Sequence, residues 1–526
     1  MKFVSIKEYI AGRKELSGWL LGLAFLLLYI FLPFKVFFNY DPYLYASETI
    51  SPFHEQWFNP HHLLFSRTHW LFFELIHLFS PKAGVLSTMS WLNAIFGALG
   101  LVLFYRLVLK LSARAYISIL LTLALGTSLG FYLYSTVGEI VVPTCFWLLL
   151  TLTMVLEGAA MTFRRSLATG LCFAAALLFH ESASIYIVLV IAILLMRSLP
   201  AQRLGNLAIF ISSIIVPVIT AYALVLIFAE GLPPTEWYRW LSGMIGTGAW
   251  LRGTPDKFPL AMAYWLNTAN HVFLLPIPRP GSLWWWFLLN KIATWGLVAF
   301  PLAAVIAFTR KKNYLGLMIL ANILIAIVMV IWWEYNCWDF YVFPFILLLL
   351  LIAWGAHRWW AFMIAGWLIF YLPLTALFNW QSYLDLVTNP RQEVLARSVN
   401  NLSRIYGGRD VLVLNSYDCL SEICVFSRVP SLYSREFQTE NEMLQLIIQR
   451  LNESRERELY TVVSDEVHQA VLNNPLQDLT ALDRKTLECS FKKATLLMNL
   501  HNELGQKVQY WELGKPEPDK MNDGQK

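Results

Sequence analysis

The chain has 526 residues, of which 57% are hydrophobic and 14% are charged, and its formal net charge at pH 7 is +5. Its mean hydropathy of +0.53 is far above that of a soluble globular protein. The composition excludes an ordinary soluble domain, and nothing in it indicates a nucleic-acid-binding protein. The sequence therefore predicts a polytopic membrane protein with one additional soluble region.

Apolar stretches long enough to cross a bilayer as helices recur along residues 1–380. We expect about eleven spanning helices. They are placed at residues 18–38, 85–108, 115–134, 138–158, 166–180, 182–197, 206–229, 284–309, 314–333, 340–356 and 360–379. The stretch 61–80 is also apolar but is interrupted by Arg67, His69, Glu74 and His77, so we expect it to lie along the membrane interface.

Basic residues orient the predicted helices, because cytoplasmic loops of membrane proteins are enriched in Lys and Arg. With a cytoplasmic N-terminus, the short basic clusters all fall on one side: Arg106, Lys110, Arg114, Arg164, Arg165, Arg197, Arg203, Arg310, Lys311, Lys312 and Arg358. The first loop, the corner near residue 139, the turn at 180–181, and the loops 230–282 and 334–339 then face the extracytoplasmic side.

The loop after the first predicted span is dense in titratable side chains. Residues 39–69 contain Asp41, Glu48, His54, Glu55, His61, His62, Arg67 and His69. A solvated interfacial loop is one interpretation. An active site is the interpretation we favour, because Glu139, His180 and Glu181 come from other helices to the same face, where ionisable groups near hydrocarbon are costly. Taken singly, Glu139 is equally well explained as an ordinary helix-end charge.

The last part of the chain, residues 381–526, carries charges throughout and has no spanning run. Alternating apolar residues predict strands at 410–416, 458–464 and 507–513, and residues 440–451 have the pattern of an amphipathic helix. Such alternation predicts a small α/β domain with a disordered tail. Because the expected number of spans is odd, this domain would lie outside the cytoplasm, following a membrane domain at 1–380 with its first extracytoplasmic loop at 39–84.

The order and sidedness of several short motifs resemble the GT-C superfamily of polytopic glycosyltransferases, especially bacterial protein O-mannosyltransferases and aminoarabinose transferases. An acidic motif just after the first span is similar to residues 39–46, NYDPYLYA. A His-Pro segment leading into an interfacial helix resembles 59–65, NPHHLLF. The later motifs are matched by 131–139, FYLYSTVGE, and by 179–182, FHES.

This resemblance implies a GT-C-like membrane glycosyltransferase that transfers a sugar from a polyprenyl-phosphate-linked donor to an envelope glycan, lipid or protein. It implies Asp41 as the catalytic base or acceptor-orienting carboxylate, since a carboxylate can take the proton of an acceptor hydroxyl. The residues expected to line the donor or acceptor pocket are Glu48, His61, His62, Glu139, His180 and Glu181. Weaker candidates for the lipid phosphate are Arg252, Lys257 and Arg279, for which a solvated loop face is slightly favoured.

Other functions remain open at this point. Three carboxylates near one site could hold a divalent cation through oxygen ligands, but no metal site is assigned. A transporter or lipid flippase is one alternative, although transporters commonly show internal repeats and charges near the bilayer midplane. A non-enzymatic envelope assembly protein is another, and it would tolerate replacement of Asp41. In the favoured interpretation the protein is integral to the bacterial inner membrane, contacts membrane lipids, and acts extracytoplasmically.

Overall fold

The computed structural model describes residues 6–33, 45, 49, 61–80, 83–158, 160–229, 233–235, 237, 295–306, 314–334, 339–356, 359–387, 410–414, 459–464, 490, 492, 494–501 and 507–513. The chain divides into two compact units. The first comprises Met1–Phe34, Phe53–Phe72 and Met89–Leu384, and the second comprises Lys35–Pro52, Phe73–Thr88 and Asp385–Lys526.

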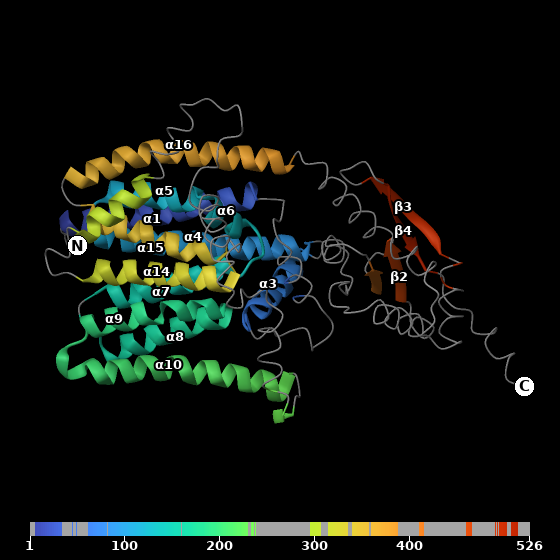
Figure 1. The fold of residues 1–526 in the computed structure, drawn as a ribbon, viewed down its shortest axis with the longest axis horizontal. Helices are drawn as coiled ribbons and strands as arrows, with labels where there is room; N and C mark the ends of the chain where they lie inside the picture. Colours follow the sequence, from blue (N-terminus) through green and yellow to red (C-terminus); the bar gives the residue numbers. More distant parts are fainter. Residues whose placement is uncertain are drawn as a thin grey trace, which may run out of the picture. The chain divides into compact units, whose positions relative to one another are not determined.

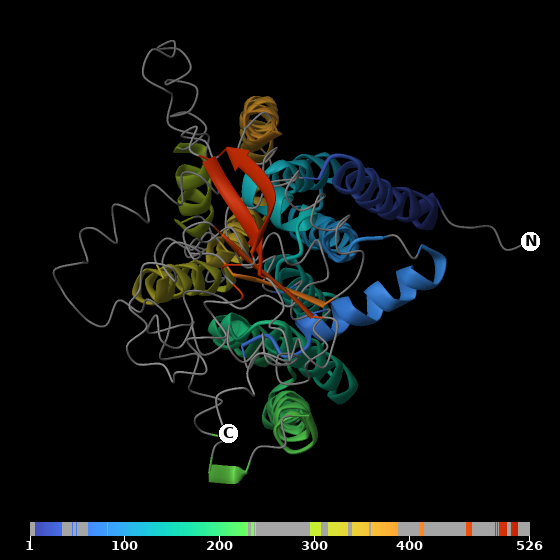
Figure 2. The same ribbon diagram turned by 90° about the vertical axis from the view of Figure 1, so that its right-hand side faces the viewer.

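Long apolar helices dominate the first unit. The helices are α1 (Ile6–Phe31), α3 (Phe65–Phe79), α4 (Val85–Ser112), α5 (Ala115–Thr127), α6 (Leu129–Thr136), α7 (Val141–Leu156), α8 (Phe163–Phe179), α9 (Ile187–Arg197), α10 (Arg203–Leu224), α14 (Leu315–Glu334), α15 (Val342–Gly355) and α16 (Trp359–Val387). Of these, α3, α4 and α16 each have part of their length in the second unit. Short helical turns cover Glu181–Tyr186 (η2) and Asp339–Tyr341 (η6), and a further apolar helix covers Trp295–Ile306. The helices α7, α8, α9 and α10 run side by side, whereas α3 lies at an angle to them (Figures 1 and 2).

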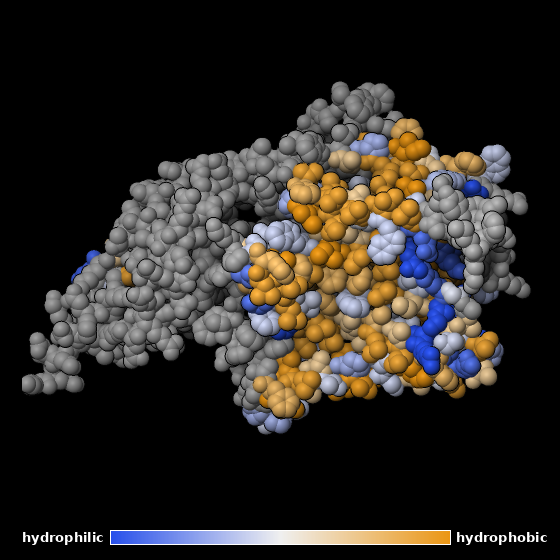
Figure 3. Space-filling model, turned by 180° about the vertical axis from the view of Figure 1, so that it is seen from behind, coloured by the Kyte–Doolittle hydropathy of each residue, from blue (hydrophilic) through white to orange (hydrophobic). Residues whose placement is uncertain are grey.

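The burial pattern separates helices of the interior from helices at the periphery. On α15 most side chains are buried, which explains its apolar composition. On α10, by contrast, Val216 and Ile219 are each 62% exposed. Figure 3 shows apolar side chains spread over one face of the helices, with hydrophilic residues gathered near one end. An apolar surface of this extent is suited to contact with lipid.

By length and apolar composition, two of the described helices are able to cross a membrane, Val85–Ser112 and Pro200–Phe228. The pair α5 and α6 makes a third if it counts as one span. Shorter apolar helices are Glu15–Phe31, Val141–Leu156, Trp295–Ile306, Leu315–Met329, Val342–Gly355 and Trp359–Leu374. Each of the eleven segments expected from the sequence contains a helix, but the number of spans stays a prediction.

The single span expected at 115–134 is wrong in its continuity. The chain leaves the helix at Ser128, where φ is −63° and ψ is 141°, and α5 and α6 are bent by 64°. The Ser128 hydroxyl donates to the carbonyl of Leu125 at 2.7 Å, which satisfies a backbone group freed by the break. The break brings the end of α6 toward the start of α7.

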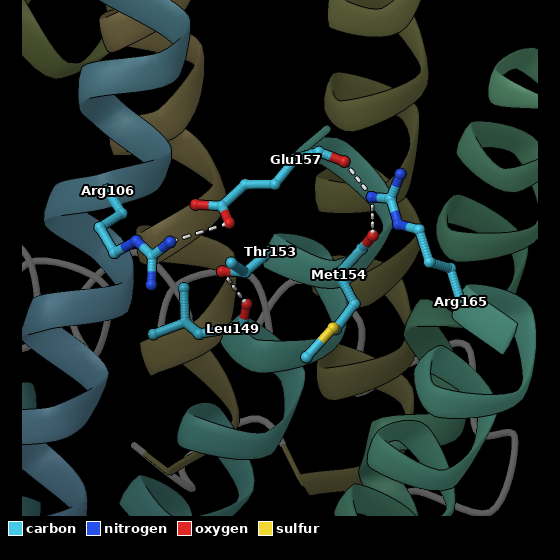
Figure 4. A network of polar contacts seen from close by, with 6 residues as sticks. All are labelled: Arg106, Leu149, Thr153, Met154, Glu157 and Arg165. Carbon is cyan, nitrogen blue, oxygen red and sulfur yellow. Dashed lines mark hydrogen bonds and ion pairs between the residues drawn. The ribbon is translucent and has the colours of Figure 1, made fainter. Parts of the chain in front are cut away.

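Arginine side chains fix the turn between α7 and α8 (Figure 4). Arg165 donates to the main-chain carbonyls of Met154 and Glu157, the first at 2.5 Å, and Arg106 of α4 pairs with the Glu157 carboxylate at 3.1 Å. The Arg165 guanidinium thus satisfies carbonyls at the C-terminal end of α7, while Arg106 binds the side chain that follows it. Because α7 and α8 run antiparallel, Glu139 and His180 lie at the opposite end of this helix pair.

The second unit contains a four-stranded sheet of order β1-β2-β4-β3. The strands are β1 (Asp410–Leu414), β2 (Leu459–Ser464), β3 (Thr495–His501) and β4 (Lys507–Glu512). The pair β1–β2 is parallel, and β4 pairs antiparallel with both β2 and β3. The predictions of β1, β2 and β4 are confirmed. Strand β3 was missed because Leu496, Leu497 and Met498 break the alternation, and the register shifts there. The helix expected at 440–451 lies outside the described residues.

Candidate functional site at one end of the helices

One face of α3 carries a ladder of aromatic and imidazole rings. The rings of His62 and Phe65 are 6.1 Å apart and perpendicular, and those of Phe65 and His69 are 4.1 Å apart. All three side chains are buried. Their spacing of three and four residues places them on one side of the helix and its preceding turn, which is why this stretch forms a half-buried helix despite its polar residues.

A buried asparagine connects this ladder to the corner between α6 and α7. Asn93 of α4 is fully buried, and its Oδ1 lies 3.0 Å from Nε2 of His69. Its Nδ2 donates to three main-chain carbonyls, those of Tyr134, Val137 and Glu139, at 3.2, 2.6 and 2.7 Å respectively. One side chain thus holds α3, α4 and the corner together.

Glu139 is fully buried at this corner, two residues before Val141, the first residue of α7. The N–H of Ile140 donates to its Oε2 at 3.2 Å. Its position at the positive end of the α7 dipole favours the ionised form, which burial alone would disfavour. A buried carboxylate that a helix N-terminus stabilises is a candidate for stabilising positive charge that develops on a substrate.

His61 and Glu181 form a hydrogen-bonded pair that joins the chain before α3 to the turn after α8. Nδ1 of His61 lies 2.7 Å from Oε1 of Glu181, and the Glu181 N–H donates to the His61 carbonyl at 3.2 Å. A third link runs from the N–H of Leu64 to the carbonyl of Leu178. The Glu181 side chain is 36% exposed, so the pair contributes little to stability. Its evident structural effect is to hold His62 close to α8.

His180 is neutral in this setting. Its Nδ1 accepts from the N–H of Ser182 at 3.2 Å and lies 2.6 Å from the Ser182 hydroxyl, so the ring proton is on Nε2. Desolvation, followed by repulsion from His62 and His61, lowers the pKa of His180 to about 3. A neutral ring with an Nε2 proton is able to donate a hydrogen bond to a substrate oxygen.

Arg67 of α3 supplies positive charge at this end. Within the described segments 61–72, 129–140 and 178–187 it is the only Lys or Arg. Its guanidinium carbon lies 5.5 Å from the ring centre of Trp70, and Nε and Nη2 are shielded from solvent. A planar guanidinium held against an aromatic ring is well suited to bind a phosphate.

The structure brings five of the predicted site residues to one end of the helices: His61, His62, Glu139, His180 and Glu181. The other predicted residues lie outside the described part of the chain: Asp41, Glu48, Arg252, Lys257 and Arg279. Within the described residues, no group of three His, Cys, Asp or Glu side chains is arranged to hold a metal ion.

Sequence reasoning gave no role to Arg67, His69 or Asn93. The first two were visible as polar residues in an otherwise apolar segment. Asn93 could have been found as a lone amide within the span expected at 85–108, because polar side chains in spanning helices are costly and usually mark a functional or paired position.

The fold matches three solved structures of other proteins. No protein-family model and no curated protein matches the sequence. The crystal structure of ArnT from Cupriavidus metallidurans in the apo state matches with a TM-score of 0.60 and 14% identity, covering 94% of this chain and 98% of that chain. The same protein bound to undecaprenyl phosphate matches with a TM-score of 0.54, 13% identity and the same coverage.

An archaeal structure matches as well. The apo oligosaccharyltransferase of Archaeoglobus fulgidus gives a TM-score of 0.50 at 11% identity, over 96% of this chain and 75% of that chain. At these identities the likeness concerns the fold. The chain therefore shares the fold of these structures, one of them of ArnT and one of an oligosaccharyltransferase, which agrees with the resemblance expected from the sequence motifs.

Proposed function

We propose that the protein is a glycosyltransferase that moves a sugar from a polyprenyl-phosphate-linked donor to a glycan, lipid or protein acceptor at the extracytoplasmic face of the bacterial inner membrane. The observation that carries the proposal is the convergence of buried Glu139, the histidines and Arg67 at one end of apolar helices. The fold supports it, because one structure that shares it was solved with undecaprenyl phosphate bound.

Different residues have different roles in the proposed sugar transfer. An oxygen of the acceptor hydroxyl bonds to the anomeric carbon of the donor sugar, and the bond from that carbon to the phosphate oxygen breaks. Asp41, in the first loop, takes the hydroxyl proton, and the polyprenyl phosphate leaves with the bonding electron pair. Arg67 stabilises the charge of the departing phosphate, with Arg252, Lys257 and Arg279 as additional candidates in the long loop. Glu139, Glu48 and the neutral ring of His180 orient the sugar or the acceptor.

The test is transfer by the purified protein in lipid, supplied with a panel of polyprenyl-phosphate monosaccharides and an envelope extract. We expect the wild type to release polyprenyl phosphate and to label an acceptor, and Asp41→Asn to lower this rate by about 10²–10⁴-fold, the usual contribution of a general base. The folding of the variant is checked by thermal unfolding. Equal turnover by both proteins removes Asp41 from the chemistry, and lipid movement without release of polyprenyl phosphate by the wild type favours a flippase. A parallel assay with a chelator tests for a divalent cation.

Arg67→Gln is expected to raise the KM for the donor by roughly 10–100-fold, because a hydrogen bond to a charged group is worth about 1.5–3 kcal/mol. Arg67→Lys keeps the charge but loses the planar fork, so an intermediate value is expected. Steady-state kinetics with one active donor measure both values. Arg203→Gln, at an exposed arginine that begins α10, serves as the control. An unchanged KM in Arg67→Gln contradicts a role in phosphate binding.

A further inference from the structure

We propose that Asn93 and His69 are positioning residues for Glu139, with His69 held as an imidazolium whose two ring N–H groups both donate hydrogen bonds. The effect on catalysis rests on the proposed function, whereas the protonation state of His69 does not.

The three carbonyls around Asn93 fix the orientation of its amide. A flipped side chain would place Oδ1 at 2.6–3.2 Å from the carbonyl oxygens of Tyr134, Val137 and Glu139, where acceptor would face acceptor. Nδ2 must therefore point to the corner, and Oδ1 must point to His69. Because Oδ1 is purely an acceptor, Nε2 of His69 has to carry a proton to form the contact at 3.0 Å.

The second ring nitrogen of His69 meets an acceptor as well. Nδ1 lies 2.9 Å from the main-chain carbonyl of Phe65. A neutral imidazole has only one N–H group. In either neutral tautomer, the unprotonated ring nitrogen would therefore face an acceptor oxygen, and two buried acceptors would repel each other. Only the doubly protonated ring satisfies both contacts. Desolvation favours the neutral ring and lowers the pKa of His69 to about 4, even though the hydrogen bonds to Phe65 and Asn93 oppose the shift. For the ring to be protonated, the two acceptor contacts, which neither neutral tautomer satisfies, must therefore outweigh this desolvation.

The charged and titratable groups around His69 have opposite effects on its protonation. Cationic groups on its own helix oppose the protonated ring, whereas a carboxylate at the corner favours it. On its own helix, Arg67 is a neighbouring cation and His62 a second imidazole. From the corner comes Glu139, whose main-chain carbonyl is linked to the His69 ring by two hydrogen bonds through Asn93. A buried imidazolium requires a compensating negative charge, and in this proposal the carboxylate of Glu139 supplies it. In return, the network holds the main chain of Glu139 at the corner that leads into α7.

The protonation state is tested directly by nitrogen NMR. The protein is labelled with ¹⁵N-histidine, placed in lipid nanodiscs at pH 7, and compared with His69→Gln to identify the His69 signals. We expect both ring nitrogens of His69 to be protonated. A signal from a bare ring nitrogen at this residue overturns the imidazolium. His77→Gln is the matched control, because His77 also stacks on the ring four residues earlier, at 4.1 Å, with Nδ1 at 3.3 Å from that residue's carbonyl.

The positioning role is tested with variants of the same residues in the donor assay. His69→Leu and Asn93→Leu are expected to lower kcat at least tenfold with an unchanged KM for the donor. His69→Gln, whose amide can still donate to Asn93, should recover most of kcat. Equal kcat in His69→Leu and wild type overturns the role, and so does a His69→Gln variant that is as impaired as His69→Leu. If the wild type turns over no donor, the proposed function fails and the NMR result still decides the state of His69.

Discussion

Glu139→Gln is expected to lower the rate of sugar transfer by roughly 10²–10³-fold, the typical loss when one preorganised electrostatic group is removed from an active site. Glutamine has almost the same volume, and its side-chain oxygen can still accept from the N–H of Ile140, which the carboxylate contacts at 3.2 Å. The substitution therefore removes the negative charge while leaving the fully buried corner filled. The loss should appear in kcat, because the charge is needed most when positive charge develops on the sugar.

The measurement is release of polyprenyl phosphate under saturating donor, with Glu157→Gln as the matched control. Glu157 follows the other end of α7 and pairs with Arg106, far along the helix from the proposed chemistry. That control should keep its rate, since a partly exposed ion pair contributes about 1 kcal/mol or less to stability. A Glu139→Gln protein with the full rate would show that Glu139 is an ordinary charge at a helix start.

Much of the helical framework could be predicted because membrane helices are encoded by long apolar runs, which is a local property of the sequence. The runs at 138–158 and 340–356 therefore contain α7 and α15. The break at Ser128 was not predicted, although Gly126, Ser128 and Gly130 are a local signal for a bend. Tertiary packing also bears on this region, because a Cβ atom at Gly126 would lie 2.5 Å from the ring of Phe25 on α1.

The site could be predicted only in part, for a similar reason. His61, Glu139 and His180 stood out because ionisable residues at predicted helix mouths are rare. That His61 pairs with Glu181, while His62 meets Phe65 edge to face, depends on how residues 120 positions apart meet in space. The role of Asn93 depends on three carbonyls freed at the corner, which no residue pattern reveals before the corner is seen.

The second large effect concerns stability, at the crossing of α8 and α10. Gly170→Ala is expected to destabilise the protein by roughly 1–3 kcal/mol, the usual cost of overpacking. A Cβ atom at Gly170 would lie 1.8 Å from Oγ of Ser213 and 2.6 Å from the main-chain carbonyl oxygen of Phe210. The serine can turn away only by giving up its hydrogen bond to that carbonyl, and the carbonyl itself cannot move unless α10 moves.

Gly366→Ala provides the matched control because the same substitution should have the opposite sign. Gly366 lies within α16, and a Cβ atom there meets nothing within 4 Å. Alanine at that position gains about 0.8–1.0 kcal/mol of helix propensity. Thermal unfolding of both variants in the same detergent, with retained secondary structure as a check, measures the difference. If Gly170→Ala unfolds at or above the wild-type temperature, the two helices do not approach as closely as the packing at Ser213 requires. If adding Ser213→Ala restores full stability, the serine alone was responsible, because that change leaves the Phe210 carbonyl in place.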